Sequence, residues 1–208
     1  AGKSTIAKRL AKELGAIYLD TGAMSRAIAY YFIQKGVDKD DIDTITKLCK
    51  DVEVSISYEN GEQQVILNGE NITCFIRQEA VGNMASATSV YPVVREKLVE
   101  LQRQLAAREN VVMDGRDIGT VVLPDANVKI FLTASSKVRA KRRFAELTAK
   151  GEKCDNDAIE KDIIERAHRD MPRETSPLKQ ADDAVLLDSS DMTIDEVVDR
   201  MKQLVKEA

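Results

Sequence analysis

The stretch "AGKST" at residues 1–5 decides the fold, because it matches the end of a loop that binds phosphate. In the pattern G-x-x-x-x-G-K-[ST], backbone N–H groups and a helix N-terminus surround phosphate oxygens, the lysine reaches the β and γ phosphates, and the hydroxyl binds Mg²⁺. Gly2, Lys3 and Ser4 occupy the last three positions of this pattern. The competing interpretation of five small and polar residues is a frayed chain end.

The residues that follow favour the phosphate-binding loop. Apolar residues recur at helical spacing from position 6 to position 14, lysines, arginine and glutamate lie between them, and Gly15 comes next. This spacing predicts an amphipathic helix that ends at the glycine. Gly2 and Lys3 therefore lie at a helix N-terminus, where unpaired N–H groups and the helix dipole favour an anion.

Composition limits the classes of protein to consider. A chain of 208 residues with 43% hydrophobic and 32% charged residues predicts a globular protein with one sizeable core and a small inserted module. The net charge of −4 argues against a general nucleic-acid-binding protein, and no apolar run approaches the roughly 18 residues that span a membrane. Three scattered cysteines and one histidine argue against a zinc site or disulfide framework and predict a cytoplasmic location.

Four short apolar segments predict buried strands, at residues 16–19, 111–113, 128–132 and 184–187. Small or polar residues follow each of them, and then usually a helical pattern, which is typical of a parallel sheet covered on both faces. Ligands bind at the carboxyl ends of such strands. The polar residues at 20–22, 114–117, 133–136 and 188–190 are therefore candidates for a site.

Residues 52–72 have a different pattern. Apolar and polar residues alternate, and Asn-Gly occurs twice at positions suited to tight turns. These features predict a small antiparallel sheet inserted between two α/β units. The spaced apolar residues within 79–107 then predict helix again.

Two basic regions follow, and each allows two interpretations. Residues 137–153 contain seven lysines and arginines, which form either a solvated helix face or a set of phosphate ligands. Residues 158–171 predict a helix on which Arg166, Arg169 and Asp170 share one side, before Pro172 and Arg173. Arginines beside a carboxylate suit a phosphate or polyol ligand, and a surface ion-pair network is the alternative.

Four motifs together resemble a known family. They are "DGRDIGTVVLPDA" (114–126), "LDTGAMSRA" (19–27), "VKIFLTASSKVRAKRR" (128–143) and "RETSPLKQADDAVLLDSS" (173–190). They resemble the bacterial cytidylate kinase family, within the P-loop nucleoside monophosphate kinases, and the similarity extends from residue 1 to about residue 198. We expect about a dozen residues to precede "AGKST" in such a family, and expect the chain as written to be poorly stable or inactive without them.

The resemblance implies an α/β, three-layer P-loop kinase fold with a parallel sheet, a small antiparallel β insert in the monophosphate-binding region and a short lid. It implies a discontinuous core at residues 1–34 and 86–208, with the lid at about 144–158, and an inserted domain at 35–85. The implied reaction is ATP-dependent phosphorylation of CMP and dCMP by direct phosphoryl transfer. The implied partners are ATP, CMP, dCMP and Mg²⁺, with no nucleic acid or membrane, and the implied state is a monomer.

The resemblance also assigns residues to the two substrates. It assigns ATP binding to Ala1, Gly2, Lys3, Ser4 and Thr5, with Ser4 also on Mg²⁺. It assigns catalytic roles to Lys3, Arg116, Arg139, Arg142 and Arg143, because arginines on a closing lid neutralise the transferring phosphoryl group and exclude water. It assigns CMP binding to Thr21, Arg26, Ser86, Arg95, Arg116, Asp117, Arg166, Asp170 and Arg173.

Asp117 gives a physical basis for base specificity, because its carboxylate can accept a hydrogen bond from the exocyclic amino group of cytosine. Uracil lacks this group, so UMP would leave a buried carboxylate unpaired. One residue departs from the family, since Ser25 stands where a tyrosine is usual, and Tyr30 or Tyr31 are the candidates to fill that volume. The alternatives to a cytidylate kinase are another small-molecule P-loop kinase of the UMP/CMP, shikimate or gluconate type, a noncatalytic nucleotide-binding module, and an interaction protein.

Overall fold

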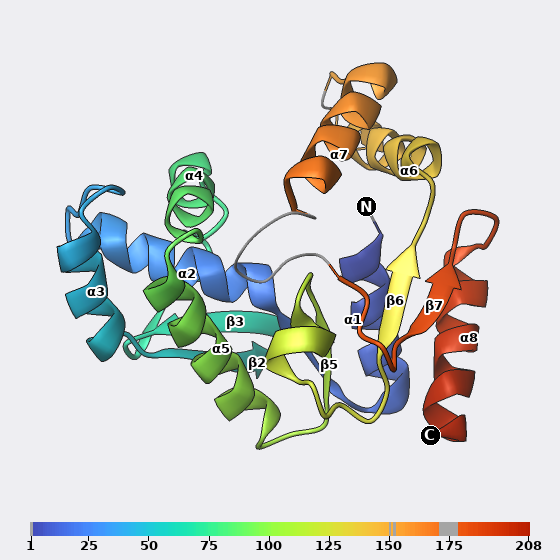
Figure 1. Cartoon of the computed structure of the whole chain (residues 1–208), viewed down its shortest axis with the longest axis horizontal. Helices are drawn as coiled ribbons and strands as arrows, with labels where there is room; N and C mark the ends of the chain where they lie inside the picture. Colours follow the sequence, from blue (N-terminus) through green and yellow to red (C-terminus); the bar gives the residue numbers. More distant parts are fainter. Residues whose placement is uncertain (1, 150, 152, 171–178) are drawn as a thin grey trace. The chain divides into compact units, whose positions relative to one another are not determined.

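The computed structural model describes residues 2–149, 151, 153–170 and 179–208, without the side chains of residues 146 and 166–170 (Figure 1). The chain divides into two compact units, one comprising Ala1–Ala16 and Arg116–Ala208 and the other Ile17–Gly115. The segment 35–85 falls entirely within the second unit. The boundaries of the core, the insert and the lid stay a prediction.

The second unit contains a pair of parallel strands and several helices. Strand β1 (Ile17–Asp20) pairs with β5 (Val111–Asp114), so that Asp20 lies opposite Asp114 at the carboxyl ends of both strands. The helices are α2 (Thr21–Gln34), α3 (Ile42–Asp51), α4 (Glu79–Thr88) and α5 (Pro92–Ala106). The predicted helical region at 79–107 is confirmed as two helices.

The antiparallel sheet predicted between residues 52 and 72 is confirmed. It consists of β2 (Val54–Glu59), β3 (Glu62–Leu67) and β4 (Glu70–Asn71) in the order β2-β3-β4. Asn60 and Asn68 have φ values of 53° and 47°, and the following Gly61 and Gly69 have 79° and 86°. Two consecutive left-handed residues form the turn that matches the twist of a hairpin, which explains why Asn-Gly stands at both turns.

Helix α2 is the centre of the core of the second unit. Met24, Ile28 and Phe32 are completely buried on it, and they pack with Ile45 of α3 and Val65 of β3. The apolar positions of α5 that the sequence marks are also buried, at Val94, Leu98 and Leu101. The insert and the helices beside it thus share one core with α2.

The first unit contains helix α1 (Lys3–Leu14), strands β6 (Ile130–Thr133) and β7 (Val185–Asp188), and the helices α6 (Ser136–Ala149), α7 (Asn156–Asp170) and α8 (Ile194–Glu207). Strands β6 and β7 are parallel, and α6 and α7 pack side by side (Figure 1). Helix α1 ends at Gly15 in the left-handed conformation, as its sequence predicts. It packs against α8, and Lys202 of α8 pairs with Glu13 of α1 at 2.7 Å.

The four predicted strands exist, but their burial differs from the prediction. Tyr18 and Leu19 of β1 are buried, whereas the residues of β5 and β6 are half-buried. In β7 only Leu187 is buried, and Val185 and Leu186 are 42% and 58% exposed. Each parallel sheet of the described residues has only two strands, so every strand has one edge without a backbone partner there.

The α/β class, the parallel strands and the small antiparallel sheet are confirmed. Among the described residues, the parallel hydrogen bonding forms two separate pairs, one in each unit. No described helix has the length and apolar character needed to span a bilayer.

Candidate phosphate-binding and acceptor sites

The end of the phosphate-binding loop lies at the start of α1. Gly2 precedes the helix with φ 93° and ψ −24°, a left-handed conformation that favours glycine. Its carbonyl accepts the first helical hydrogen bond, from Ile6 N at 2.9 Å. Lys3, Ser4 and Thr5 are exposed in the first turn, which contains no acidic residue. A helix N-terminus with an exposed lysine and hydroxyls can bind an anion.

A second group of polar side chains, which includes Arg26, lies where β1 passes into α2. Asp20 caps α2, because its Oδ1 accepts a hydrogen bond from Ala23 N at 3.0 Å. Thr21 Oγ1 donates to Asp114 O at 2.9 Å, which ties the first residue of α2 to the end of β5. Arg26 folds back toward this turn, with Nη2 3.7 Å from Asp20 Oδ2.

The absence of a side chain at Gly22 leaves space for the guanidinium of Arg26 beside Asp20. A Cβ at position 22 would lie 3.2 Å from Asp20 Oδ1 and 3.3 Å from Arg26 Nη1, closer than ordinary contact distance. The Nε of Arg26 is buried and has no hydrogen-bond partner among the described residues. A buried donor without a partner is costly, and an anion bound beside the guanidinium would relieve that cost. Thr21 and Arg26 both lie near the start of α2, at the carboxyl end of β1, and their contact with the CMP phosphate stays a prediction.

The other predicted acceptor residues of the second unit lie on the next two helices. Ser86 is exposed on α4, which packs against α2, and its carbonyl accepts a hydrogen bond from Ser89 Oγ at 3.0 Å. Arg95 is half-buried near the start of α5. The roles of Ser86 and Arg95 in binding CMP stay predictions.

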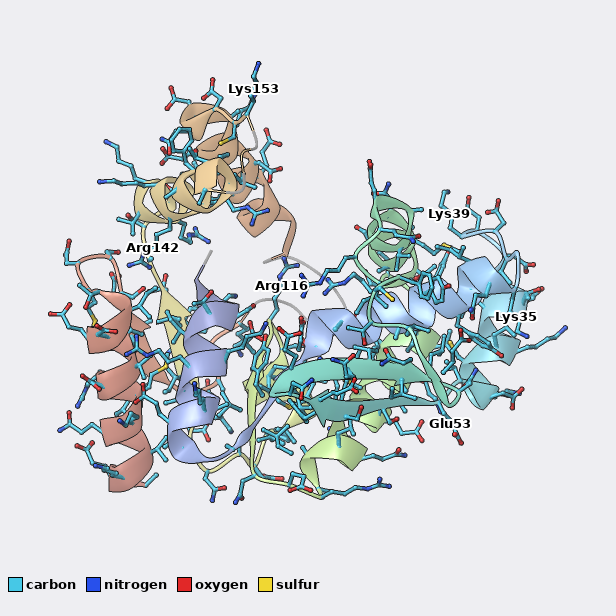
Figure 2. All side chains as sticks on the ribbon, turned by 180° about the vertical axis from the view of Figure 1, so that it is seen from behind. Lys35, Lys39, Glu53, Arg116, Arg142 and Lys153 are labelled. Atoms are coloured by element: carbon cyan, nitrogen blue, oxygen red, sulfur yellow. The ribbon has the colours of Figure 1, made fainter. Side chains whose placement is uncertain are left out.

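The motif at 114–126 forms a tight turn rather than a regular helix. After β5, Arg116 (Figure 2) and the buried Asp117 precede a single π-helical turn, η1 (Ile118–Val122). Val122 N donates to Asp117 O at 3.2 Å and Leu123 N to Ile118 O at 2.7 Å, which is the five-residue spacing of a π turn. Such turns occur frequently at functional sites. Asp114 has a partner that the sequence did not indicate, since Tyr18 OH donates to its Oδ1 at 2.8 Å.

The three arginines of α6 have three different environments. Arg142, which is labelled in Figure 2, donates from Nη1 to Ser189 Oγ at 3.2 Å. Its Nη2 donates to Ser189 O at 2.6 Å and to Met192 O at 3.1 Å. Arg139 has a buried Nε without a hydrogen-bond partner among the described residues. Arg143 is exposed. In this structure Arg142 holds α6 to the turn between β7 and α8.

Hydroxyl groups form a hydrogen-bond network that holds the turn between β7 and α8. Ser189 is 1% exposed, and its Oγ donates to Thr133 O of β6 at 3.0 Å. Ser190 Oγ accepts from Ser135 N at 3.0 Å and donates to Asp188 Oδ1 at 2.6 Å. The hydrogen bonds from the Ser190 hydroxyl and backbone N–H lower the pKa of Asp188. The sequence placed these residues at a strand end and gave no signal for their bonds to Arg142.

Three further predicted residues lie on or near α7. Arg166 and Asp170 belong to this helix, but their side chains are not among those described. Arg173, like Ala1, lies outside the described residues.

The departure at Ser25 leaves its position without an aromatic ring. Ser25 Oγ donates to Thr21 O at 3.3 Å. Tyr30 stacks on Phe75, with ring centroids 5.5 Å apart, and Tyr31 is buried in the core. The filling of the volume beside Ser25 by either tyrosine stays a prediction.

The fold and these two arrangements define a class of protein. A Gly-Lys-Ser at a helix N-terminus, polar residues at the ends of parallel strands and arginines on the following helices are typical of P-loop kinases, which transfer phosphoryl groups. Comparison with known proteins gives the family. The family model of cytidylate kinase matches residues 1–207.

Proteins named cytidylate kinase match along nearly the whole chain. The cytidylate kinase of Geobacillus sp. (strain WCH70) is 47% identical over 207 residues, which is 100% of this chain and 92% of the relative. The cytidylate kinases of Bacillus licheniformis and Lactobacillus johnsonii are each 48% identical, over 99% of this chain and 91% and 90% of their own lengths. The chain belongs to the cytidylate kinase family, whose members are phosphotransferases with a phosphate group as acceptor.

Proposed function

We propose that this chain transfers the γ-phosphoryl group of ATP to CMP and to dCMP, giving ADP and CDP or dCDP. The observation that carries the proposal is the family match over residues 1–207. The anion-binding arrangements at the starts of α1 and α2 support it, because phosphoryl transfer needs one set of groups for the donor and one for the acceptor phosphate.

On the donor side, Lys3 and the backbone of residues 1–5 bind the ATP phosphates. A magnesium ion supplies charge neutralisation between the phosphates when it is bound. The hydroxyl of Ser4, exposed in the first turn of α1, is an oxygen ligand of the kind that Mg²⁺ accepts alongside phosphate oxygens and water. The chain's own contribution is to orient the phosphates along the helix N-terminus.

On the acceptor side, Thr21, Arg26 and Arg116 bind the CMP phosphate. Asp117, which is 7% exposed, accepts a hydrogen bond from the cytosine amino group. The remaining CMP contacts, near the base and the sugar, belong to Ser86, Arg95, Arg166, Asp170 and Arg173.

The lid is formed by about residues 144–158, and α6 supplies the arginines that meet the transferring phosphoryl group. Arg139 and Arg143 contact that group, because a planar guanidinium can follow charge on the equatorial oxygens. Arg142 acts through the turn after β7, to which its guanidinium donates. The inserted domain comprises residues 35–85 within a core formed by 1–34 and 86–208, and the chain acts as a cytoplasmic monomer.

A coupled assay of ADP release with ATP and Mg²⁺ tests the proposal in a chain that carries the family's strand and complete phosphate-binding loop before residue 1, with CMP, dCMP, UMP and AMP as acceptors. We expect strong turnover of CMP and dCMP and weak turnover of UMP. Asp117→Ala should narrow the difference between CMP and UMP. Equal use of UMP and CMP by the enzyme without this substitution would show a broader pyrimidine kinase. No turnover with any acceptor would favour the alternative of a noncatalytic nucleotide-binding module.

A further inference from the structure

The hairpin of the insert reaches the β1–α2 junction through one cross-strand pair. Tyr58 of β2 and Gln63 of β3 lie directly opposite each other, next to the pair that closes the turn. The hydroxyl of Tyr58 donates to Tyr18 O, and Gln63 Oε1 accepts from Asp20 N at 3.2 Å. The two side chains of this cross-strand pair therefore form hydrogen bonds with the backbone of β1.

These two hydrogen bonds pair backbone groups on the edge of β1 that faces away from β5. The N–H and C=O groups of residues two apart in a strand point to the same side. Ile17 N donates to Asn110 O at 2.8 Å, toward β5, so Tyr18 and Asp20 present their backbone groups to the opposite side. On that side Tyr58 and Gln63 make the hydrogen bonds that a neighbouring strand would otherwise make. Tyr58 donates to the C=O of Tyr18, and Gln63 accepts from the N–H of Asp20.

Asp20 links this edge to the phosphate site. The residue whose N–H bonds to Gln63 is the residue whose carboxylate caps α2 and lies 3.7 Å from Arg26. Arg26 pairs with Asp20, and its buried Nε has no hydrogen-bond partner among the described residues. The direction of its guanidinium therefore depends on where Asp20 is held.

We propose that Tyr58 and Gln63 are positioning residues for the acceptor phosphate site, and that they set the affinity for the nucleoside monophosphate by fixing Asp20, Thr21 and Arg26. The inference rests on the proposed function and deepens it. It gives the antiparallel insert a role in binding the acceptor, through the two hydrogen bonds at the end of its hairpin. Burial raises the pKa of Tyr58 to about 12, so its hydroxyl stays a donor throughout the neutral range.

Two substitutions test the inference in the full chain. Gln63→Leu removes the acceptor for Asp20 N, and Tyr58→Phe removes the donor to Tyr18 O while keeping the ring. Each loses one hydrogen bond, so we expect the KM for CMP to rise about 5–10-fold. The kcat and the KM for ATP should change less than about two-fold, since α1 and its lysine are untouched. Titration of CMP without ATP, by calorimetry, should show the same loss of affinity.

The chain offers a matched control in the next residue. Gln64 is also half-buried on β3, but its side chain points to the other face and accepts from Asn71 Nδ2 at 3.2 Å. Gln64→Leu should leave the KM for CMP within about two-fold of the unmodified chain. If Gln64→Leu raised that KM as much as Gln63→Leu, general loosening of the hairpin would be the cause and the inference would be wrong.

A double-mutant cycle decides whether Gln63 acts through Arg26. Because the proposed effect passes through this arginine, Gln63→Leu should weaken CMP binding much less when Arg26→Ala is already present. Fully additive losses would overturn the inference. Unchanged KM values in both single variants of an active enzyme would overturn this inference alone. A chain with the restored strand and loop that neither bound nor phosphorylated CMP would overturn the proposed function as well.

Discussion

Helices α2 and α6 both begin at the end of a parallel strand and both carry arginines assigned to phosphate groups, yet they are held in opposite ways. On α2, seven residues are buried, including the fully buried Met24, Ile28 and Phe32. Among the described side chains of α6, only Ala140 is buried. Helix α6 packs against α7, and the three hydrogen bonds of Arg142 hold it to the turn after β7.

The difference indicates what each helix can do. Burial of a large apolar side chain contributes about 1.5–3 kcal/mol, so the buried face of α2 fixes it to the core of its unit. A hydrogen bond to a charged group contributes about 1.5–3 kcal/mol at most and can be exchanged for water. We therefore expect α2 to be a rigid support for the acceptor phosphate, and α6 to be a helix that can move when a substrate binds.

The largest expected difference between the two helices is in the free energy of unfolding. Phe32→Ala should lower the free energy of unfolding by about 3–5 kcal/mol, because it leaves a cavity in the core around α2. Val138→Ala, at a half-buried position of α6, should cost less than about 1 kcal/mol. Urea unfolding followed by circular dichroism measures both. Equal losses would show that α6 is packed as firmly as α2.

The next test separates the two arginine sites by kinetics. Arg26→Ala should raise the KM for CMP about 100-fold, since it removes a phosphate ligand of the bound acceptor. Arg139→Ala should lower kcat about 10²–10³-fold with little change in the KM for CMP, as expected for charge stabilisation in the transition state. Steady-state kinetics with each substrate varied in turn distinguishes the two patterns. The same pattern for both variants would contradict the division between a fixed site and a moving helix.

A third test removes the bonds that hold α6. Arg142→Ala should lower kcat about ten-fold and the free energy of unfolding by about 1–2 kcal/mol, because Ser189 and Met192 lose their donors. Arg142→Lys should not restore the enzyme, since an ammonium cannot reproduce the fork that serves three oxygens. Lys141→Ala, an exposed position on the same helix, is the matched control and should be near the unmodified chain.

Much of the fold could be predicted from the sequence, because it depends on local pattern. The spacing of apolar residues predicts α1 and α5, the two Asn-Gly pairs predict the turns of the insert, and the residues after each strand mark the candidate sites. These signals are local: helical spacing and turn chemistry involve residues a few positions apart.

The contacts that distinguish the two helices could not be predicted, because they join distant residues. Arg142 donates to Ser189, 47 positions away, and Gln63 accepts from Asp20, 43 positions away. A pattern of basic residues indicates that α6 is polar, but it does not tell which arginine binds the protein and which is available to a ligand. The exposure of β7 was also missed, because an apolar run looks the same at the edge of a sheet as at its centre.

Cysteines allow the two regions to be compared in the native state. Cys49 lies in the core around α2, and burial raises the pKa of its thiol to about 11. Cys154 follows α6 and is only half-buried, with Sγ 3.9 Å from Phe144 O. In variants that retain one cysteine each, a thiol reagent at pH 8 should modify Cys154 readily and Cys49 only through unfolding. Equal rates would contradict the comparison.

The thiol of Cys49 also makes the core around α2 sensitive to alkali. Its pKa is raised in the folded state, so the stabilisation is present below the ordinary value near 9 and is lost as the pH rises toward about 11. The melting temperature should therefore fall between pH 9 and pH 11 more steeply in the unmodified chain than in Cys49→Ala. Parallel slopes would show that this thiol does not titrate on unfolding.

The smallest expected effect is a loss of hydrogen-exchange protection in α6 at low pH, when the turn between β7 and α8 loosens. Hydrogen bonds from Ser190 lower the pKa of Asp188, so its carboxylate stabilises the turn above the ordinary pKa of about 4 and stops doing so as the pH falls through the lowered value. Because Ser190 Oγ also accepts from Ser135 N at the start of α6, protonation should loosen this helix before it disturbs α2. Hydrogen exchange between pH 3 and pH 5, corrected for the intrinsic rate, should show lost protection in α6 first, and Asp188→Asn should show that loss already at pH 5. Loss of protection in α2 at the same pH would mean that the two helices are not held independently.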